Sequence, residues 1–173
     1  MVNPSRTNTK FIEEREFEIK VVKSQNRVAL NLTLLQIVVG VFTFIVAVSP
    51  HILEQNLLIA VQLVMCIPLL MSSTFSRQKH AYAKSSHLWS GFGYVTFLLA
   101  YSALINVVGI LLSLYATIAI ALSFFAVCIV LAIAYSVMEV LEIEEKLFFR
   151  IAKDALFIIL LVVFGVLPVI GVY

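Results

Sequence analysis

Long apolar runs separated by short polar segments dominate this chain. Each run approaches the about 20 residues that a helix needs to cross the roughly 30 Å hydrocarbon core of a bilayer. The pattern therefore predicts five membrane-crossing helices, with the fifth at the edge of the bundle. We expect them at residues 29–49, 55–75, 89–110, 112–138 and 155–172. The expected organisation is a charged cytoplasmic N-terminal segment, 1–28, followed by one transmembrane domain, 29–173.

The longest uninterrupted stretch, residues 87–137, contains no Asp, Glu, Lys or Arg. About fifty helical residues measure roughly 75 Å, which is more than one span can use. We therefore expect a helical hairpin with its turn near residues 106–113. Small residues recur at four-residue spacing along its second arm, and such a stripe lets another helix approach closely in lipid. This expected helix-packing face consists of Ser113, Thr117, Ala121, Cys128, Ala132 and Ser136. It favours a central position for the fourth span.

Composition strengthens the membrane interpretation. Of the 173 residues, 62% are hydrophobic and 13% are charged, and the mean hydropathy is +1.06. Soluble domains have about 45–50% apolar and about 25% charged residues. The predicted fold class is an all-α integral membrane protein, a five-helix transmembrane bundle with short loops. We expect no cleavable signal peptide, because the first apolar run begins near Val28, behind a charged segment.

The basic residues predict an orientation. Of the twelve Lys and Arg residues, six precede the first span, three separate the second and third, and three separate the fourth and fifth. Even numbers of spans separate these groups, so five spans place all positive charges on one side. The positive-inside rule then predicts a cytoplasmic N-terminus and an outer C-terminus. We expect the plasma membrane, since no retention or transit signal is recognised. The basic residues are interleaved with acids, so no nucleic-acid partner is expected.

Residues 139–154 form an amphipathic segment between the fourth and fifth spans, on the predicted cytoplasmic side. Apolar residues share one helical face and charged residues the other. This segment extends the fourth span or lies as an interfacial helix on the bundle. The alternative is a coupling helix that senses a cytoplasmic ligand or docks a partner.

Few polar side chains lie deep in the predicted spans. The candidates for a small polar cavity are Gln62, Ser102, Asn106 and Thr117. The alternative is that such amides join helices, where they contribute about 0.6–2 kcal/mol. Tyr94 and Tyr101 share one face of the third span. They are expected to pack or to mark the interface, with a cation-binding aromatic site as the alternative.

The sequence predicts no catalytic, cofactor or metal site. The predicted spans contain no ionisable residue, which argues against a carboxylate-driven proton-coupled transporter and against a voltage sensor. Cys66 and Cys128 lie in apolar runs, where cysteines behave as small hydrophobic residues. We expect a non-catalytic accessory or scaffold subunit that packs with other membrane proteins. The alternative is a small homo-oligomeric channel or facilitator for ions or small polar solutes. The expected partners are the lipid bilayer and either further copies of the chain or a larger membrane complex.

Overall fold

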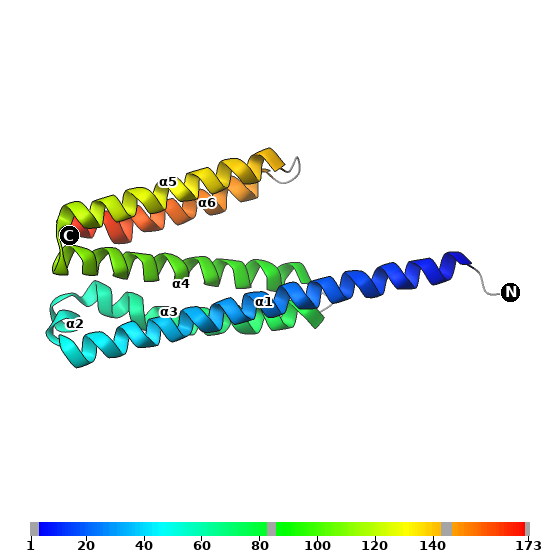
Figure 1. The fold of residues 1–173 in the computed structure, drawn as a ribbon, viewed down its shortest axis with the longest axis horizontal. Coiled ribbons are helices and arrows are strands. Elements are labelled where there is room, and N and C mark those ends of the chain that lie inside the picture. Colours follow the sequence, from blue (N-terminus) through cyan, green and yellow to red (C-terminus); the bar gives the residue numbers. More distant parts are fainter. Residues whose placement is uncertain (1–3, 83–85, 143–146, 172–173) are drawn as a thin grey trace.

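The protein is all-helical in the part of the chain that the structure describes. This structure is a computed structural model, and it describes residues 4–82, 86–142 and 147–171. Its elements are α1 (Pro4–Val48), α2 (His51–Gln55), α3 (Leu57–Tyr82), α4 (Ser86–Tyr115), α5 (Ile118–Glu142), α6 (Leu147–Leu161), the π-helical turn η1 (Val162–Val166) and α7 (Leu167–Val169) (Figure 1).

Five helices are long and apolar enough to cross a membrane. They comprise Phe17–Val48, Leu57–His80, Leu88–Tyr115, Ile118–Met138 and Ile151–Val169. The prediction of an all-α fold with five long apolar helices is confirmed. The short connections at α2 and between α4 and α5 leave neighbouring helices antiparallel (Figure 1).

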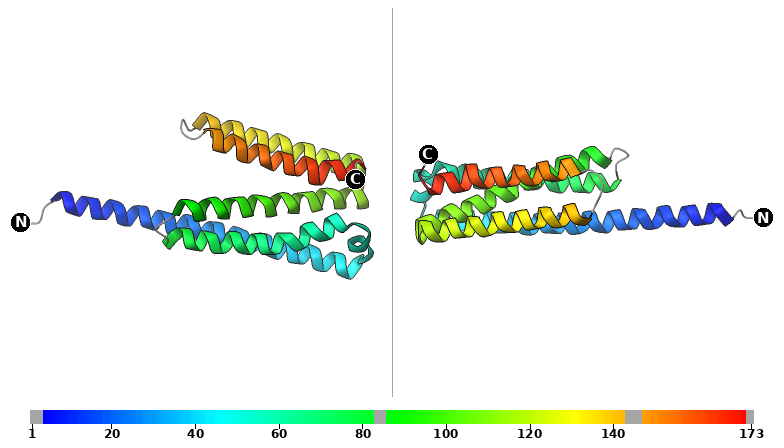
Figure 2. Two further views of the ribbon diagram at one scale, coloured as in Figure 1. Left: turned by 180° about the vertical axis from the view of Figure 1, so that it is seen from behind. Right: turned by 90° about the horizontal axis from the view of Figure 1, so that it is seen from above.

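Helix α4 lies in the middle of the arrangement. Helices α1 and α3 cover one side of it, and α5 with α6 cover the other (Figures 1 and 2). In the apolar window of each helix, 50% of the residues of α4 are buried, against 11% in α5 and 11% in the fifth span. The expectation that the fourth span, α5, is central was therefore wrong, because α4 alone packs against helices on both sides. The expected position of the fifth span at the edge is confirmed.

The turn of the long hairpin comes later than expected. Helix α4 continues to Tyr115 and α5 begins at Ile118, so the turn falls at residues 116–117. The hydroxyl of Thr117 accepts a hydrogen bond from the Ile120 backbone N–H at 3.2 Å. This contact satisfies a backbone donor in the first turn of α5, so Thr117 acts as a capping residue.

The amphipathic segment 139–154 does not form a separate helix in the described residues. Its first residues close α5 and its last residues open α6, while 143–146 lie outside the described part. The fifth apolar helix begins at Ile151, so Lys153 and Asp154 lie within it rather than before it. The expectation of spans without ionisable residues is corrected here, and also at Arg27 and Arg77, which lie within the first and second apolar helices.

Phe125 of α5, which is 1% exposed, packs this helix against α4 and the last helix. Its ring lies against Gly109 of α4 and Gly165 of η1. A Cβ atom built on Gly109 would lie 2.2 Å from the Phe125 Cζ atom, and one on Gly165 would lie 2.5 Å from the Cε1 atom. No side chain fits at either position without movement, so the two glycines make room for the ring.

Side-chain hydrogen bonds join α1, α3 and α4. The Asn31 amide of α1 donates to the Ser73 hydroxyl of α3 at 3.0 Å, and Ser73 donates to the Gly93 carbonyl of α4 at 2.7 Å. All three residues are buried. The Cys66 thiol of α3 lies 3.3 Å from the Ala100 carbonyl of α4, and it donates there. These contacts fix three helices against one another at buried positions, where an unmade hydrogen bond would be costly.

Candidate functional site

The structure brings two of the four expected cavity residues to the same helix end. The Gln62 amide donates to the Phe164 carbonyl at 3.2 Å, and the Asn106 amide donates to the Leu160 carbonyl at 3.2 Å. Both side chains are buried and both reach the region of η1. They join α3 and α4 to the last helix instead of bonding each other.

The other two expected cavity residues serve local structure. The buried Ser102 hydroxyl donates within α4 to the Leu99 carbonyl at 3.0 Å. Thr117 is exposed and caps α5. Gln62 and Asn106 thus make the helix-joining contacts that the alternative expects, whereas a shared polar cavity of the four residues stays a prediction.

The contact of Gln62 has a backbone cause. In an α-helix the carbonyl of residue 164 accepts a hydrogen bond from the N–H four residues later. That residue is Pro168, which has no N–H. The Gln62 amide donates to this carbonyl, which Pro168 cannot serve. A polar side chain from α3 thus completes the backbone hydrogen bonding of the fifth apolar helix.

Both amides keep an unused acceptor. The Oε1 atom of Gln62 and the Oδ1 atom of Asn106 are buried and have no hydrogen-bond partner among the described residues. A Cβ atom built on Gly165 would lie 2.5 Å from this Asn106 oxygen. The glycine therefore gives the amide of Asn106 its space as well as the ring of Phe125.

The expected helix-packing face is divided between elements. Ser113 lies in α4 and Thr117 lies in the turn, so the stripe does not run along one helix. Ala121 is buried against the core. Cys128 and Ala132, both half-buried, instead line a pocket between α4, α5 and α6, and Ser136 is half-buried outside it. The face is corrected in its first two members.

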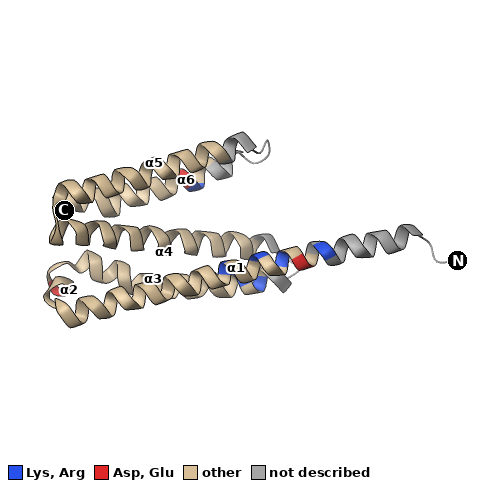
Figure 3. Cartoon of the chain, viewed as in Figure 1, with Lys and Arg blue, Asp and Glu red and all other residues tan. Residues whose placement is uncertain are grey.

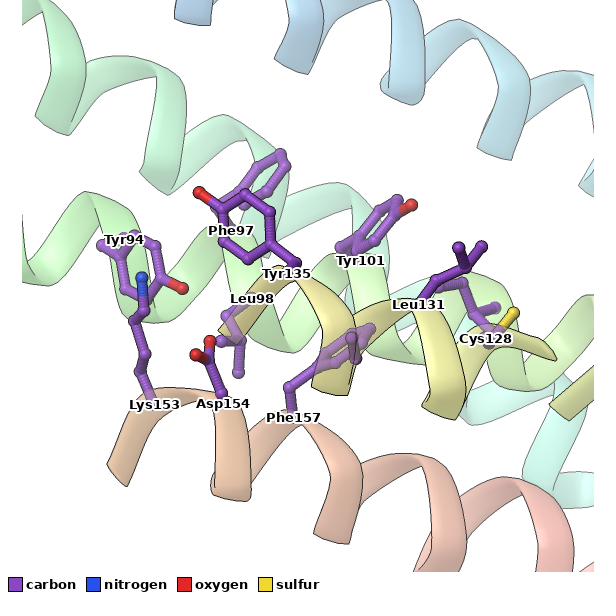
Figure 4. Close-up of a pocket in the computed structure, with 12 residues that line it drawn as sticks. Tyr94, Phe97, Leu98, Tyr101, Cys128, Leu131, Tyr135, Lys153, Asp154 and Phe157 are labelled. Atoms are coloured by element: carbon purple, nitrogen blue, oxygen red, sulfur yellow. The ribbon is translucent and has the colours of Figure 1, made fainter. Parts of the chain in front are cut away.

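This pocket between α4, α5 and α6 has a volume of about 470 Å³. Its volume falls in the size range of small-molecule sites. Its lining consists of Tyr94, Phe97, Leu98, Tyr101, Ile105, Cys128, Leu131, Ala132, Tyr135, Lys153, Asp154 and Phe157 (Figure 4). The α4 members recur every three or four residues over eleven positions, which is about 17 Å of helix. The pocket is therefore elongated along the helices.

One end of this pocket is charged. The Lys153 Nζ atom lies 5.4 Å from the ring centre of Tyr94 and 5.9 Å from that of Tyr135 (Figure 4). These are cation–π distances. Beside it, the Oδ2 atom of Asp154 is buried and has no hydrogen-bond partner within the described ranges. The pocket thus combines an apolar body with a charged end.

The aromatic face that the sequence predicts is present. Tyr94 and Tyr101 both line the pocket. Tyr101 stacks on Phe97 at 5.8 Å and on Phe157 at 5.9 Å between ring centres. The cation at this face is the protein's own Lys153. The sequence pattern identifies Tyr94 and Tyr101 but misses Tyr135, Lys153, Asp154 and Phe157.

The sequence holds one usable sign of the missed residues. A basic and an acidic residue directly precede the predicted fifth span. The predicted third span carries aromatic residues at three- and four-residue spacing. Within the described residues, no three His, Cys, Asp or Glu side chains cluster to hold a metal ion. Comparison of the chain with protein-family models, curated proteins and solved structures gave no match, so the geometry alone carries the functional argument.

Proposed function

We propose that this chain is a non-catalytic integral membrane protein of five spans, an accessory or scaffold subunit that packs beside other membrane proteins. Its proposed membrane is the plasma membrane, with a cytoplasmic N-terminus and an outer C-terminus. The single observation that carries this proposal is the position of α5, a helix of apolar residues that leaves most of its surface uncovered.

Length, apolarity and charge support insertion in a bilayer. The shortest of the five apolar helices has 19 residues, close to the about 20 that a span requires. The described Lys and Arg residues gather at one end of the bundle, while the acidic residue of α2 lies at the other (Figure 3). The end rich in Lys and Arg is the proposed cytoplasmic end.

The exposed face of α5 supports a packing role. Val127, Val130 and Val137 are each more than half exposed. Exposure of such an apolar face to water is unfavourable, whereas the face can contact lipid tails or the helix of another protein. Ala126 and Ala134 are also exposed on α5. Small side chains beside valines allow a neighbouring helix to approach closely.

The hydrogen bonds of the polar side chains buried within the apolar helices favour a subunit over a channel. A water-filled pore needs polar side chains turned toward a shared lumen. Gln62 and Asn106 donate instead to carbonyl groups of the last helix. Neither residue lines the pocket between α4, α5 and α6.

Affinity purification from native membranes tests the proposal. The tagged chain is expected to recover another membrane protein in a fixed ratio. Val130→Trp enlarges the exposed face of α5 and should reduce recovery about tenfold, since a bulky ring separates closely packed helices. Leu57→Trp, at the exposed start of α3, is the matched control and should leave recovery unchanged.

Purified protein in liposomes tests the channel alternative. The proposed subunit should give no solute or ion flux above that of empty liposomes. Flux that falls with Gln62→Leu, together with a monomeric or homo-oligomeric mass and no stoichiometric partner, would contradict the subunit and establish the alternative.

A further inference from the structure

A buried arginine lies where α1, α3 and α4 meet. Arg77 of α3 is only 5% exposed. No carboxylate forms an ion pair with it among the residues that the structure describes. Arg27 of α1 lines the same small pocket as Arg77. Buried charges in proteins are normally paired, because an unpaired charge loses hydration without compensation. An anion between the two guanidinium groups would supply such a partner.

The two arginines share a small pocket. Its volume is about 150 Å³, and its lining consists of Arg27, Leu30, Asn31, Arg77, Tyr94 and Phe97. Arg27, Leu30 and Asn31 lie on one face of α1, because their spacing is three and four residues. The pocket is thus built by fixed positions on three helices.

The neighbouring hydrogen bonds hold the pocket in shape. Ser24 of α1 donates to the Arg77 carbonyl, which joins α1 to α3 beside the pocket. The Asn31 amide is held by Ser73. A Cβ atom built on Gly93 of α4 would lie 3.5 Å from the Arg77 Nε atom. The Arg77 side chain therefore lies within van der Waals distance of the α4 backbone.

We propose that Arg27 and Arg77 bind a phosphate group. A guanidinium presents planar donors that match phosphate oxygens two at a time, and two such groups would also balance the charge of a phosphate. The pocket has room for a group of that size and not for a nucleotide. The group comes either from a phospholipid headgroup or from free phosphate. Arg27 and Arg77 line the pocket. The described Lys and Arg residues gather at one end of the bundle (Figure 3), which suits a lipid headgroup.

Thermal unfolding of the full chain in maltoside micelles, which contain no phosphate, tests this proposal independently of the accessory role. The probes are phosphatidic acid, inorganic phosphate and diacylglycerol, which has the same chains as phosphatidic acid without the phosphate. Saturating phosphatidic acid should raise the melting temperature by about 5 °C. Diacylglycerol should leave it unchanged.

Two variants and a control identify the residues. Arg77→Met and Arg27→Met should each weaken the affinity for the phosphate probe about tenfold or more, because each removes hydrogen bonds to a charged group. Without a probe, Arg77→Met should melt no lower than the parent protein, since it removes an unpaired buried charge. Lys79→Met, an exposed cation two residues along α3, should bind as the parent does.

The probes separate the two sources. Stabilisation by phosphatidic acid alone supports a lipid headgroup, and stabilisation by inorganic phosphate as well supports a site for free phosphate. The proposal is overturned if neither phosphate probe stabilises the protein, if diacylglycerol acts equally, or if Lys79→Met weakens binding as much as Arg77→Met.

Discussion

The two sides of α4 are built differently. On one side, α1 and α3 pack closely and exchange buried hydrogen bonds with each other and with α4, through Asn31, Ser73 and Cys66. On the other side, α5 and α6 leave an elongated pocket against α4 that is lined mainly by aromatic and aliphatic side chains. One chain of similar apolar character throughout thus forms a tight half and an open half.

The size of the side chains between the helices sets how closely their backbones approach. This distance explains the difference between the tight half and the open half better than hydrophobicity does. In the tight half, Gly93 of α4 allows Ser76 of α3 to approach, so that the Ser76 hydroxyl donates to the Trp89 carbonyl. In the open half, Tyr101 and Phe157 stack between α4 and α6 and keep the helix backbones apart. In an apolar environment, small residues bring helices together and large rings separate them.

The largest expected effect comes from filling the close contact between Gly109 of α4 and Phe125 of α5. Gly109→Ala places a methyl group within 2.2 Å of the Phe125 ring, so it should lower the free energy of unfolding by about 3 kcal/mol. Unfolding of the purified protein by sodium dodecyl sulfate in mixed micelles measures it. Gly40→Ala, with no atom within 4 Å, is the control and should be neutral or slightly stabilising. Equal losses for both variants would show that this contact is not special.

A smaller effect is expected where the tight half reaches the last helix. Gln62→Leu removes the donor to the Phe164 carbonyl and should cost about 1.5 kcal/mol in the same unfolding assay. Pro168→Ala restores a backbone N–H that can serve this carbonyl. In the Pro168→Ala background, Gln62→Leu should therefore cost about half as much. If the losses in unfolding free energy of the two variants simply add, the restored N–H does not replace the Gln62 amide as the donor to this carbonyl.

Within the tight half, Ser73→Ala should cost about 1 kcal/mol, because it leaves the Asn31 amide without its acceptor and removes the contact of α3 with the Gly93 carbonyl of α4. The matched change is Thr33→Ala. Thr33 is exposed and bonds only within α1, to the Ala29 carbonyl, so its loss should be close to zero. A larger loss at Thr33 than at Ser73 would remove the claimed difference between the halves.

The smallest perturbation uses the two natural cysteines. Cys66 is fully buried in the tight half, whereas Cys128 lines the open pocket. A small maleimide should label Cys128 about tenfold faster than Cys66 in micelles, because access limits the reaction of buried thiols. Mass spectrometry of the labelled peptides gives both rates. Prior addition of a small apolar ligand should slow only Cys128. Similar rates at both sites would mean that the pocket is closed.

The sequence predicts the number and type of helices well, because membrane-length apolar runs leave few alternatives. It places the turn of the long hairpin badly. Asn106 resembles a turn residue, but inside α4 its amide reaches the Leu160 carbonyl of another helix. Only tertiary structure supplies that acceptor. The true turn is marked by Thr117, a capping residue whose spacing in the sequence suggests a packing face instead.

The same reason limits prediction of the site. Tyr94 and Tyr101 share a face by their spacing alone, so the sequence finds them. Tyr135 and Lys153 reach that face only because α5 and α6 fold back along α4. Likewise, the sequence pattern puts Arg77 in a basic connection between spans, and only the structure places it at 5% exposure between helices.

Helix α1 is much longer than a bilayer is thick. Its 45 residues correspond to about 68 Å of helix, roughly twice the hydrocarbon thickness of a bilayer. In the proposed orientation, this helix projects as a stalk about 38 Å beyond the hydrocarbon core on the cytoplasmic side. A fluorophore near Pro4 would then stand well clear of the lipid surface, and energy transfer to labelled lipids would report its height directly.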